Sequence, residues 1–257
     1  ANGTHYRCEI SSYISYGGSR ACFINKQKDL ENKIVLLGNS HAQMYAPLIS
    51  EVVSNDINLL LVPLNECLPT TLINVSKECL QLANRNLSSV LKDESVTKVV
   101  ISTTWYAQEY IDSNGLSVSR NNLKFAMEDL IKKVQKSGKN VILFSPIPIP
   151  KKNYASELAR KLKFNKITEQ EALEIIKVPR VKFEQNLSEV NDHFINLMGY
   201  SYIRVYDDLC DQIYCYYGTN EIFYFADSSH LSHEAVLQLA KVKRQLKFLL
   251  THYDKNL

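Results

Sequence analysis

The sequence has no apolar run long enough to span a membrane, and it carries little net charge. Its 257 residues include 30 Lys and Arg against 27 Asp and Glu, a formal net charge of +3. So small a charge does not favour a nucleic-acid partner, and a spanning helix needs about 20 consecutive apolar residues. We see no signal peptide. Because the chain starts with Ala-Asn-Gly and not with methionine, we expect a processed piece whose targeting or membrane segment lies upstream.

The sequence also lacks C-x-x-C motifs and histidine pairs at metal-binding spacing, so we expect no metal site. Six cysteines form three local pairs: Cys8 with Cys22, Cys67 with Cys79, and Cys210 with Cys215. Six cysteines permit 15 pairings, and we favour the local ones because each brackets a short stretch of loop-forming residues. Disulfides would indicate an oxidising compartment. The alternative is six buried thiols in a cytosolic protein.

The composition is that of a globular protein, with 45% hydrophobic and 22% charged residues. Short apolar runs predict five strands, at about 33–37, 57–62, 96–102, 141–144 and 202–206. Helical patterns lie between and after them, at about 42–54, 76–92, 120–136, 183–198 and 233–251. This alternation predicts an α/β fold with a doubly wound, mostly parallel five-stranded sheet flanked by helices. The predicted domain covers residues 33–257, and residues 1–32 are expected to be an irregular N-terminal extension stapled by Cys8–Cys22.

The stretch at about 146–182 interrupts this alternation and is interpreted as a helical insertion. Three prolines at its start, Pro146, Pro148 and Pro150, exclude a helix or a central strand there. Nine Lys and Arg against four Glu follow in residues 151–182. A solvated helical face explains them simply. The alternative is a lid or a docking face for anionic glycans or lipid head groups.

The most informative stretch is Lys33 to Pro47, in which an apolar run stops at Gly38 and a helical pattern begins shortly after Ser40. Ser40 is therefore predicted at the carboxyl end of a strand, where open α/β sheets bind ligands. The N–H groups of the helix start beside it could stabilise an oxyanion. The simpler alternative is that this serine only caps the helix.

A nucleophilic serine needs a base, which is itself oriented by a third group. The histidines are His5, His41, His193, His230, His233 and His252. His41 adjoins Ser40, but side chains one position apart at a helix start do not face each other. His230 is the better candidate because Asp227 precedes it by three residues, so that one turn can direct both side chains to the same side. Alternatively, Asp227 and Ser232 only cap local turns.

These two stretches resemble the first and last motif blocks of the SGNH hydrolase superfamily. Leu36-Leu37-Gly38-Asn39-Ser40-His41-Ala42 and Asp227-Ser-Ser-His230-Leu-Ser are similar to the blocks L-L-G-D-S-H and D-x-x-H-L-S. The closest variant is the SGNH domain fused behind the acyltransferase-3 membrane domain of bacterial O-acetyltransferases. The cysteine pairs and a third strand that ends near Trp105 are also typical of that group, and the resemblance spans about residues 8–250. It implies an SGNH, flavodoxin-like fold.

The resemblance implies a catalytic triad of Ser40 as nucleophile, His230 as base and Asp227 as the residue that orients the base. The backbone N–H of Ser40 is the one oxyanion donor we assign, and the second donor stays unknown. Two motif blocks depart from the superfamily. The third block, Gly-x-Asn-Asp, is replaced by Ser102-Thr-Thr-Trp105, and no second-block glycine is recognisable in residues 69–74. The usual aspartate before the serine is Asn39, which supports the turn and is not the triad acid.

The function implied is an O-acyltransferase domain that transfers an acetyl group to a hydroxyl of a cell-surface glycan, such as the lipopolysaccharide O-antigen. The alternatives are a carbohydrate or acyl esterase with the same triad, and a non-catalytic glycan-binding module. The domain is expected to bind no cofactor of its own. The acetyl group, ultimately from acetyl-CoA, would arrive through an acyltransferase-3 transmembrane domain of the same full-length chain. This places the domain in the periplasm, attached to the inner membrane.

Overall fold

The chain folds around one mixed seven-stranded sheet. The computed structural model describes residues 13–25, 32–105, 109–197 and 199–251. The strand order is β1-β2-β4-β3-β6-β9-β11. The strands are β1 (Ile14–Tyr16), β2 (Ser19–Phe23), β3 (Lys33–Gly38), β4 (Asn58–Pro63), β6 (Val96–Ser102), β9 (Asn140–Phe144) and β11 (Ser201–Ile203). The last five are parallel to one another, which confirms the predicted α/β fold with a mostly parallel sheet.

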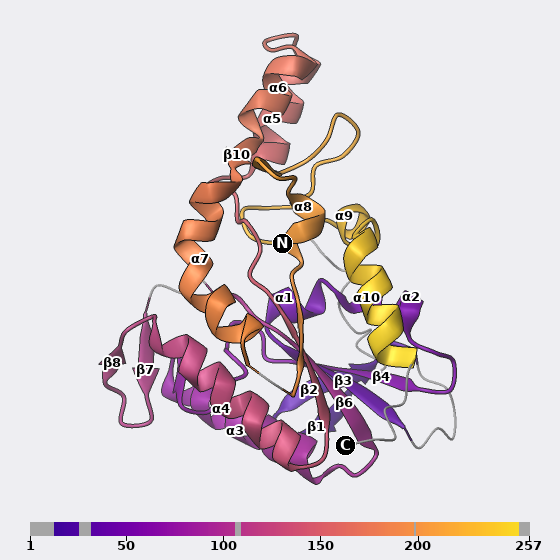
Figure 1. Cartoon of the computed structure of the whole chain (residues 1–257), viewed down its shortest axis with the longest axis vertical. Coiled ribbons are helices and arrows are strands. Elements are labelled where there is room, and N and C mark those ends of the chain that lie inside the picture. Colours follow the sequence, from indigo (N-terminus) through magenta and orange to yellow (C-terminus); the bar gives the residue numbers. More distant parts are fainter. Residues whose placement is uncertain (1–12, 26–31, 106–108, 198, 252–257) are drawn as a thin grey trace.

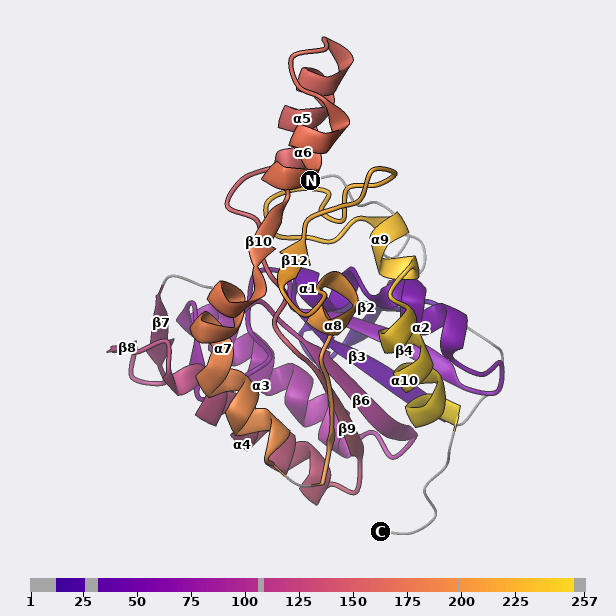
Figure 2. The same ribbon diagram turned by 45° about the horizontal axis from the view of Figure 1, so that its top comes forward.

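The central strands are apolar on both faces because helices cover both sides of the sheet (Figure 2). The helices are α1 (Ser40–Gln43), α2 (Ala46–Val52), α3 (Lys77–Lys92), α4 (Asn122–Lys136), α5 (Tyr154–Lys163), α6 (Glu169–Ile175), α7 (Arg180–Ile195), α8 (Tyr206–Leu209), α9 (His233–Leu237) and α10 (Ala240–Thr251). One core lies between the sheet and α2, α9 and α10, and the other lies between the sheet and α3 and α4. Parallel strands of this kind bring their carboxyl ends to one edge.

The prediction of an irregular N-terminal extension is wrong for residues 14–23. Strands β1 and β2 form a hairpin, and β2 pairs antiparallel with β4 at the edge of the sheet. The hairpin turn is Gly17-Gly18, with Gly17 at a φ of +61°, and paired glycines are typical of two-residue hairpin turns. Cys22 is disulfide-bonded, but Cys8 lies outside the described residues, so the Cys8–Cys22 pairing stays a prediction.

Two of the predicted helices are each divided in two. The stretch predicted as one helix at 42–54 forms α1 and α2, because Pro47 has no N–H and its ring would clash with the carbonyl four residues earlier. The stretch at 233–251 forms α9 and α10. The Asp208 carboxylate accepts hydrogen bonds from the backbone N–H groups of Lys241 and Val242, at 3.0 and 2.9 Å. This cap fixes a new helix start at Ala240.

The fifth predicted strand is also shorter than expected. It was predicted over 202–206, but β11 ends at Ile203, and the chain then turns into α8. Ser145, which follows β9, binds this bend: its backbone N–H donates to the Ile203 carbonyl and its hydroxyl accepts from the Val205 N–H, both at 2.9 Å. The bend ends the strand because Val205 bonds to a side chain and not to the neighbouring strand.

The predicted insertion contains a helical arm. Helices α5 and α6 project from the body along the longest axis of the molecule (Figure 1). Two small sheets accompany the main one: β10 (Lys177–Pro179) pairs with β12 (Tyr214–Tyr216), and β5 (Ile73–Asn74) pairs with β7 (Tyr110–Asp112), which pairs with β8 (Ser117–Val118). In the described part of the chain, no helix is both long and apolar enough to cross a membrane.

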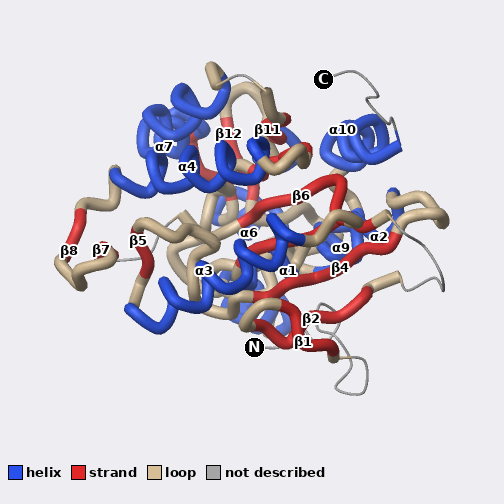
Figure 3. The backbone as a smooth tube through the Cα atoms, turned by 90° about the horizontal axis from the view of Figure 1, so that it is seen from below, coloured by secondary structure: helices blue, strands red, loops and turns tan. Residues whose placement is uncertain are grey.

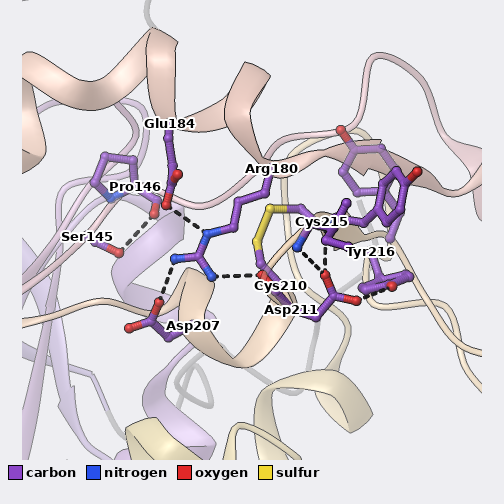
Figure 4. The surroundings of a disulfide bond; sticks show 12 residues. Ser145, Pro146, Arg180, Glu184, Asp207, Cys210, Asp211, Cys215 and Tyr216 are labelled. Atoms are coloured by element: carbon purple, nitrogen blue, oxygen red, sulfur yellow. Dashed lines mark hydrogen bonds and ion pairs between the residues drawn. A yellow bond between two sulfur atoms is a disulfide. The ribbon is translucent and has the colours of Figure 1, made fainter.

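Two of the predicted disulfides are present. Cys67 is joined to Cys79, which ties the loop after β4 to the first turn of α3. Cys210, at the end of α8, is joined to Cys215 in β12. Figure 4 shows Arg180 of α7 beside this second bond; its guanidinium donates to the Asp211 carbonyl at 2.8 Å. The loop between the two cysteines is thereby fastened to the start of α7.

Candidate active site

The turn after β3 presents Ser40 at the start of α1. Gly38 has a φ of +151°, and a Cβ atom there would lie 1.8 Å from the backbone oxygen of Ser102 in β6, so only glycine fits. Asn39 caps α1: its side-chain oxygen accepts from the His41 N–H at 3.0 Å and from the Thr104 N–H at 3.2 Å. One amide therefore fixes the helix start and joins the ends of β3 and β6.

A second turn holds Asp227 and His230. An antiparallel bridge between Phe225 and Leu231 closes this turn. Inside it, Oδ1 of Asp227 accepts from the backbone N–H groups of Ser229 and His230, at 2.7 and 2.8 Å. Aspartate often organises a turn in this way. The turn directs the Asp227 carboxylate and the His230 ring to the same side.

The fold brings the two turns together, although Ser40 and His230 are 190 residues apart in sequence. Ser40 Oγ lies 2.7 Å from His230 Nε2, and His230 Nδ1 lies 2.8 Å from Asp227 Oδ2. If Nδ1 carries the ring proton and donates a hydrogen bond to the carboxylate, Nε2 is free to accept the proton of the serine hydroxyl. The side chains of His230 and Asp227 are 31% and 39% exposed, so the site is open to solvent.

The surroundings favour the ionised form of Asp227. Burial alone would raise the pKa of this carboxyl, but the hydrogen bonds from the Ser229 N–H and from His230 outweigh burial and lower it. The hydroxyl of Ser229 adds a hydrogen bond to Oδ1 of Asp227 at 3.2 Å. Sequence reasoning did not assign this serine a role, although its place inside Asp227-Ser-Ser-His230 was visible.

His41 adjoins Ser40 in sequence, but among the described residues the hydrogen bond to the Ser40 hydroxyl comes from His230 and not from His41. Its ring is buried, with 5% exposure, and packs against the His230 ring at a centroid distance of 5.4 Å. Burial, and next the charge of His230, lower the pKa of His41 to about 3. An imidazole with so low a pKa is a weak base, which agrees with its exclusion on sequence grounds.

An oxyanion formed at Ser40 would have one donor that we can assign among the described residues. Ser40 is the first residue of α1, so its backbone N–H has no acceptor within the helix. The end of β6, where the superfamily carries an asparagine, has Thr103 and Thr104 instead, and we assign no second donor. Within the described residues, no group of three or more His, Cys, Asp or Glu side chains could hold a metal ion.

Comparison with known proteins identifies the family. A family model described as "SGNH domain (fused to AT3 domains)" matches residues 7–245. The periplasmic domain of a lipopolysaccharide acetyltransferase from Salmonella ser. Paratyphi A has a similar fold, with 19% identity, a TM-score of 0.60 and coverage of 88% of this chain and 85% of that one. A Streptococcus pneumonia protein described as a platelet activating factor is 17% identical over 87% of both chains, with a TM-score of 0.44. No curated protein sequence matches. The chain therefore belongs to the family of SGNH domains that are fused to AT3 domains.

Proposed function

We propose that this chain transfers an acetyl group to a hydroxyl of a cell-surface glycan, with Ser40, His230 and Asp227 as its catalytic triad. The observation that carries the proposal is the continuous chain of contacts from Ser40 Oγ to His230 to Asp227, at 2.7 and 2.8 Å. Family membership and the fold shared with a lipopolysaccharide acetyltransferase domain support the acetyl group and the glycan as reactants.

In the first step, Ser40 takes up the acetyl group. His230 Nε2 accepts the hydroxyl proton while Ser40 Oγ bonds to the carbonyl carbon of the acetyl donor. The negative charge that develops on the carbonyl oxygen faces the Ser40 N–H at the start of α1. When the tetrahedral intermediate collapses, the bond to the donor breaks and His230 gives its proton to the leaving group. Asp227 stabilises the imidazolium throughout.

In the second step, the glycan takes the place of the leaving group. His230 Nε2 accepts a proton from a glycan hydroxyl, whose oxygen attacks the acetyl carbonyl carbon. The bond to Ser40 Oγ breaks, and the proton returns from His230 to the serine. The product is an acetylated glycan and a regenerated Ser40. The partial exposure of His230 and Asp227 leaves room for a large acceptor at this position.

The fused AT3 domain that defines the family suggests the source of the acetyl group. We infer that a membrane-embedded acyltransferase-3 domain in the full-length chain carries the acetyl group, ultimately from acetyl-CoA, to this domain in the periplasm. The two observed disulfides suit an oxidising compartment. No cofactor is needed in either step, because the serine itself carries the acetyl group.

The test compares wild type with Ser40→Ala and with Ser50→Ala, a matched control on α2. Each protein is incubated with a small acetyl ester and a de-O-acetylated surface polysaccharide, and acetylated glycan and free acetate are measured. Transfer that is lost in Ser40→Ala and kept in Ser50→Ala supports the proposal. Acetate release that does not depend on the acceptor identifies an esterase. If Ser40→Ala keeps full activity and a fluorophosphonate probe does not label Ser40, the triad assignment is wrong.

A further inference from the structure

A cavity of about 300 Å³ lies between α4, α7 and Trp105, which follows the end of β6. Figures 1 and 3 show α4 and α7 side by side, and an ion pair between Lys124 and Glu189 joins them at 3.2 Å. Three apolar side chains also line the cavity: Leu123, Leu187 and Val190. The volume is at the lower end of the range for ligand pockets, which suits one sugar residue better than a long chain.

Trp105 supplies an uncommitted donor to this cavity. Its side chain is 3% exposed and packs edge-on against Phe194, with ring centroids 5.5 Å apart. Its indole N–H has no hydrogen-bond partner in the described part of the chain. Buried N–H groups are rarely left unpaired in native proteins. This one is closed to solvent in the present conformation, so a ligand oxygen would reach it only after a small movement of the cavity wall.

Uncharged polar side chains surround the same cavity. Asn121 stands at the N-terminus of α4, and its side chain makes no capping hydrogen bond there. Gln185 and Ser188 are exposed on α7 and line the opposite wall. Amide and hydroxyl groups around an aromatic and aliphatic floor match the hydroxyls and the C–H faces of a sugar. Lys124 and Glu189 form an ion pair, and Arg120 adds a further cation to the lining, so the cavity suits a sugar that is neutral or carries an acidic group.

The backbone connects this cavity to Ser40. Trp105 directly follows Thr104, whose N–H donates to the side-chain oxygen of Asn39 at 3.2 Å, and Asn39 precedes Ser40. Consecutive Cα atoms are about 3.8 Å apart, so the backbone at Trp105 lies within a few residues of the turn that holds Ser40. We propose that the cavity at Trp105 binds a sugar residue of the acceptor glycan next to the residue that is acetylated. This inference rests on the proposed function for the identity of the ligand.

The chain has one tryptophan, so its intrinsic fluorescence reports on this cavity directly. The probe is a set of oligosaccharides from the producing organism's surface polysaccharide, freed of esters by alkali. They are titrated into the Ser40→Ala protein, in which no turnover occurs. We expect a saturable change in tryptophan emission. Gln185→Ala and Asn121→Ala should each weaken binding about threefold to tenfold, the loss expected for one hydrogen bond. The matched control Gln245→Ala, on α10, should bind like its parent.

The outcomes separate the cavity from the catalytic proposal. If emission does not change at oligosaccharide concentrations up to about 10 mM, beyond the weak end of the affinity scale, the cavity is not a sugar site. An equal change in Gln185→Ala, Asn121→Ala and Gln245→Ala leads to the same conclusion. Saturable binding that depends on Gln185, in a protein whose Ser40 proves inactive, upholds the cavity and overturns the proposed function. Trp105→Phe keeps an aromatic ring in the core but removes the indole N–H, and its affinity for the oligosaccharides is measured by calorimetry. A loss of about threefold to tenfold supports a hydrogen bond from the indole, and an unchanged affinity excludes it.

Discussion

Buried His41 makes a contribution to the pH dependence of this domain's stability, and His41→Gln should remove that contribution. The imidazole is enclosed beside the His230 ring. Burial and the charge of His230 disfavour the protonated form, while the nearby Asp227 carboxylate favours it less strongly, and together they lower the pKa of His41 to about 3. Folded protein therefore keeps this ring neutral at any pH above about 3.

The size of the effect follows from the difference between the two states. In the unfolded chain, histidine has a pKa of about 6.5. Between about pH 6.5 and 3, the unfolded chain binds a proton that the folded protein does not bind, so stability falls as the pH is lowered. For these two pKa values, the loss due to His41 is about 2 kcal/mol at pH 5 and close to zero above about pH 7.5.

Urea unfolding at pH 7.5 and pH 5.0 measures this difference. The free energy of unfolding of the wild type should fall by about 2 kcal/mol more between the two pH values than that of His41→Gln. Ser50→Ala on α2, which changes no titratable group, is the control and should lose as much stability between the two pH values as the wild type. If wild type and His41→Gln lose the same stability to within about 0.5 kcal/mol, burial does not lower the pKa of His41 in the folded protein and the reasoning is refuted.

Three further changes test the two turns and one disulfide. Asp227→Asn keeps the backbone hydrogen bonds of its turn but faces the imidazole with an N–H donor, so kcat for acetyl transfer should fall about 10³–10⁴-fold; a loss under about tenfold would contradict the assigned role. Gly38→Ala forces a Cβ onto a backbone carbonyl of β6 and should cost more than about 3 kcal/mol of unfolding free energy. Gly138→Ala, whose Cβ meets nothing, should cost about 1–2 kcal/mol, and equal losses would refute the clash. Cys67→Ser with Cys79→Ser opens a loop with a sequence separation of 12 and should lower the unfolding free energy by about 3 kcal/mol; calorimetry showing less than about 1 kcal/mol would refute the constraint.

The parallel core of the fold was predictable because its signal is local. Strands buried on both faces carry short continuous apolar runs, here residues 34–37 of β3 and 99–101 of β6. The hairpin of β1 and β2 carries no such signal, since its strands lie at the sheet edge and mix buried with exposed residues. Its Gly17-Gly18 turn was the one visible clue. The break before α2 was also readable from Pro47.

In the candidate site, too, the local features were predictable from the sequence and the tertiary contacts were not. Ser40, Asp227 and His230 could be named because each sits in a short turn with its own chemistry, and a family motif joined the turns. The hydrogen bond from the Thr104 N–H to Asn39 joins residues 65 positions apart. Only tertiary packing creates such a contact, so no local sequence pattern indicates it. The cavity at Trp105 is hidden for the same reason, because α4 and α7 meet there only in the folded chain.

The openness of the site bears on how acetyl transfer can prevail over hydrolysis. His230 and Asp227 are partly exposed, so water can reach an acetylated Ser40 as readily as a sugar hydroxyl can. Nothing in the triad itself distinguishes the two acceptors, since His230 deprotonates either one. A bound acceptor changes this balance by holding its hydroxyl near the acetyl group and by displacing water from the open side. If the Trp105 cavity binds the acceptor as proposed, weakening it through Gln185→Ala should raise the ratio of free acetate to acetylated glycan. An unchanged ratio would place the choice of acceptor elsewhere.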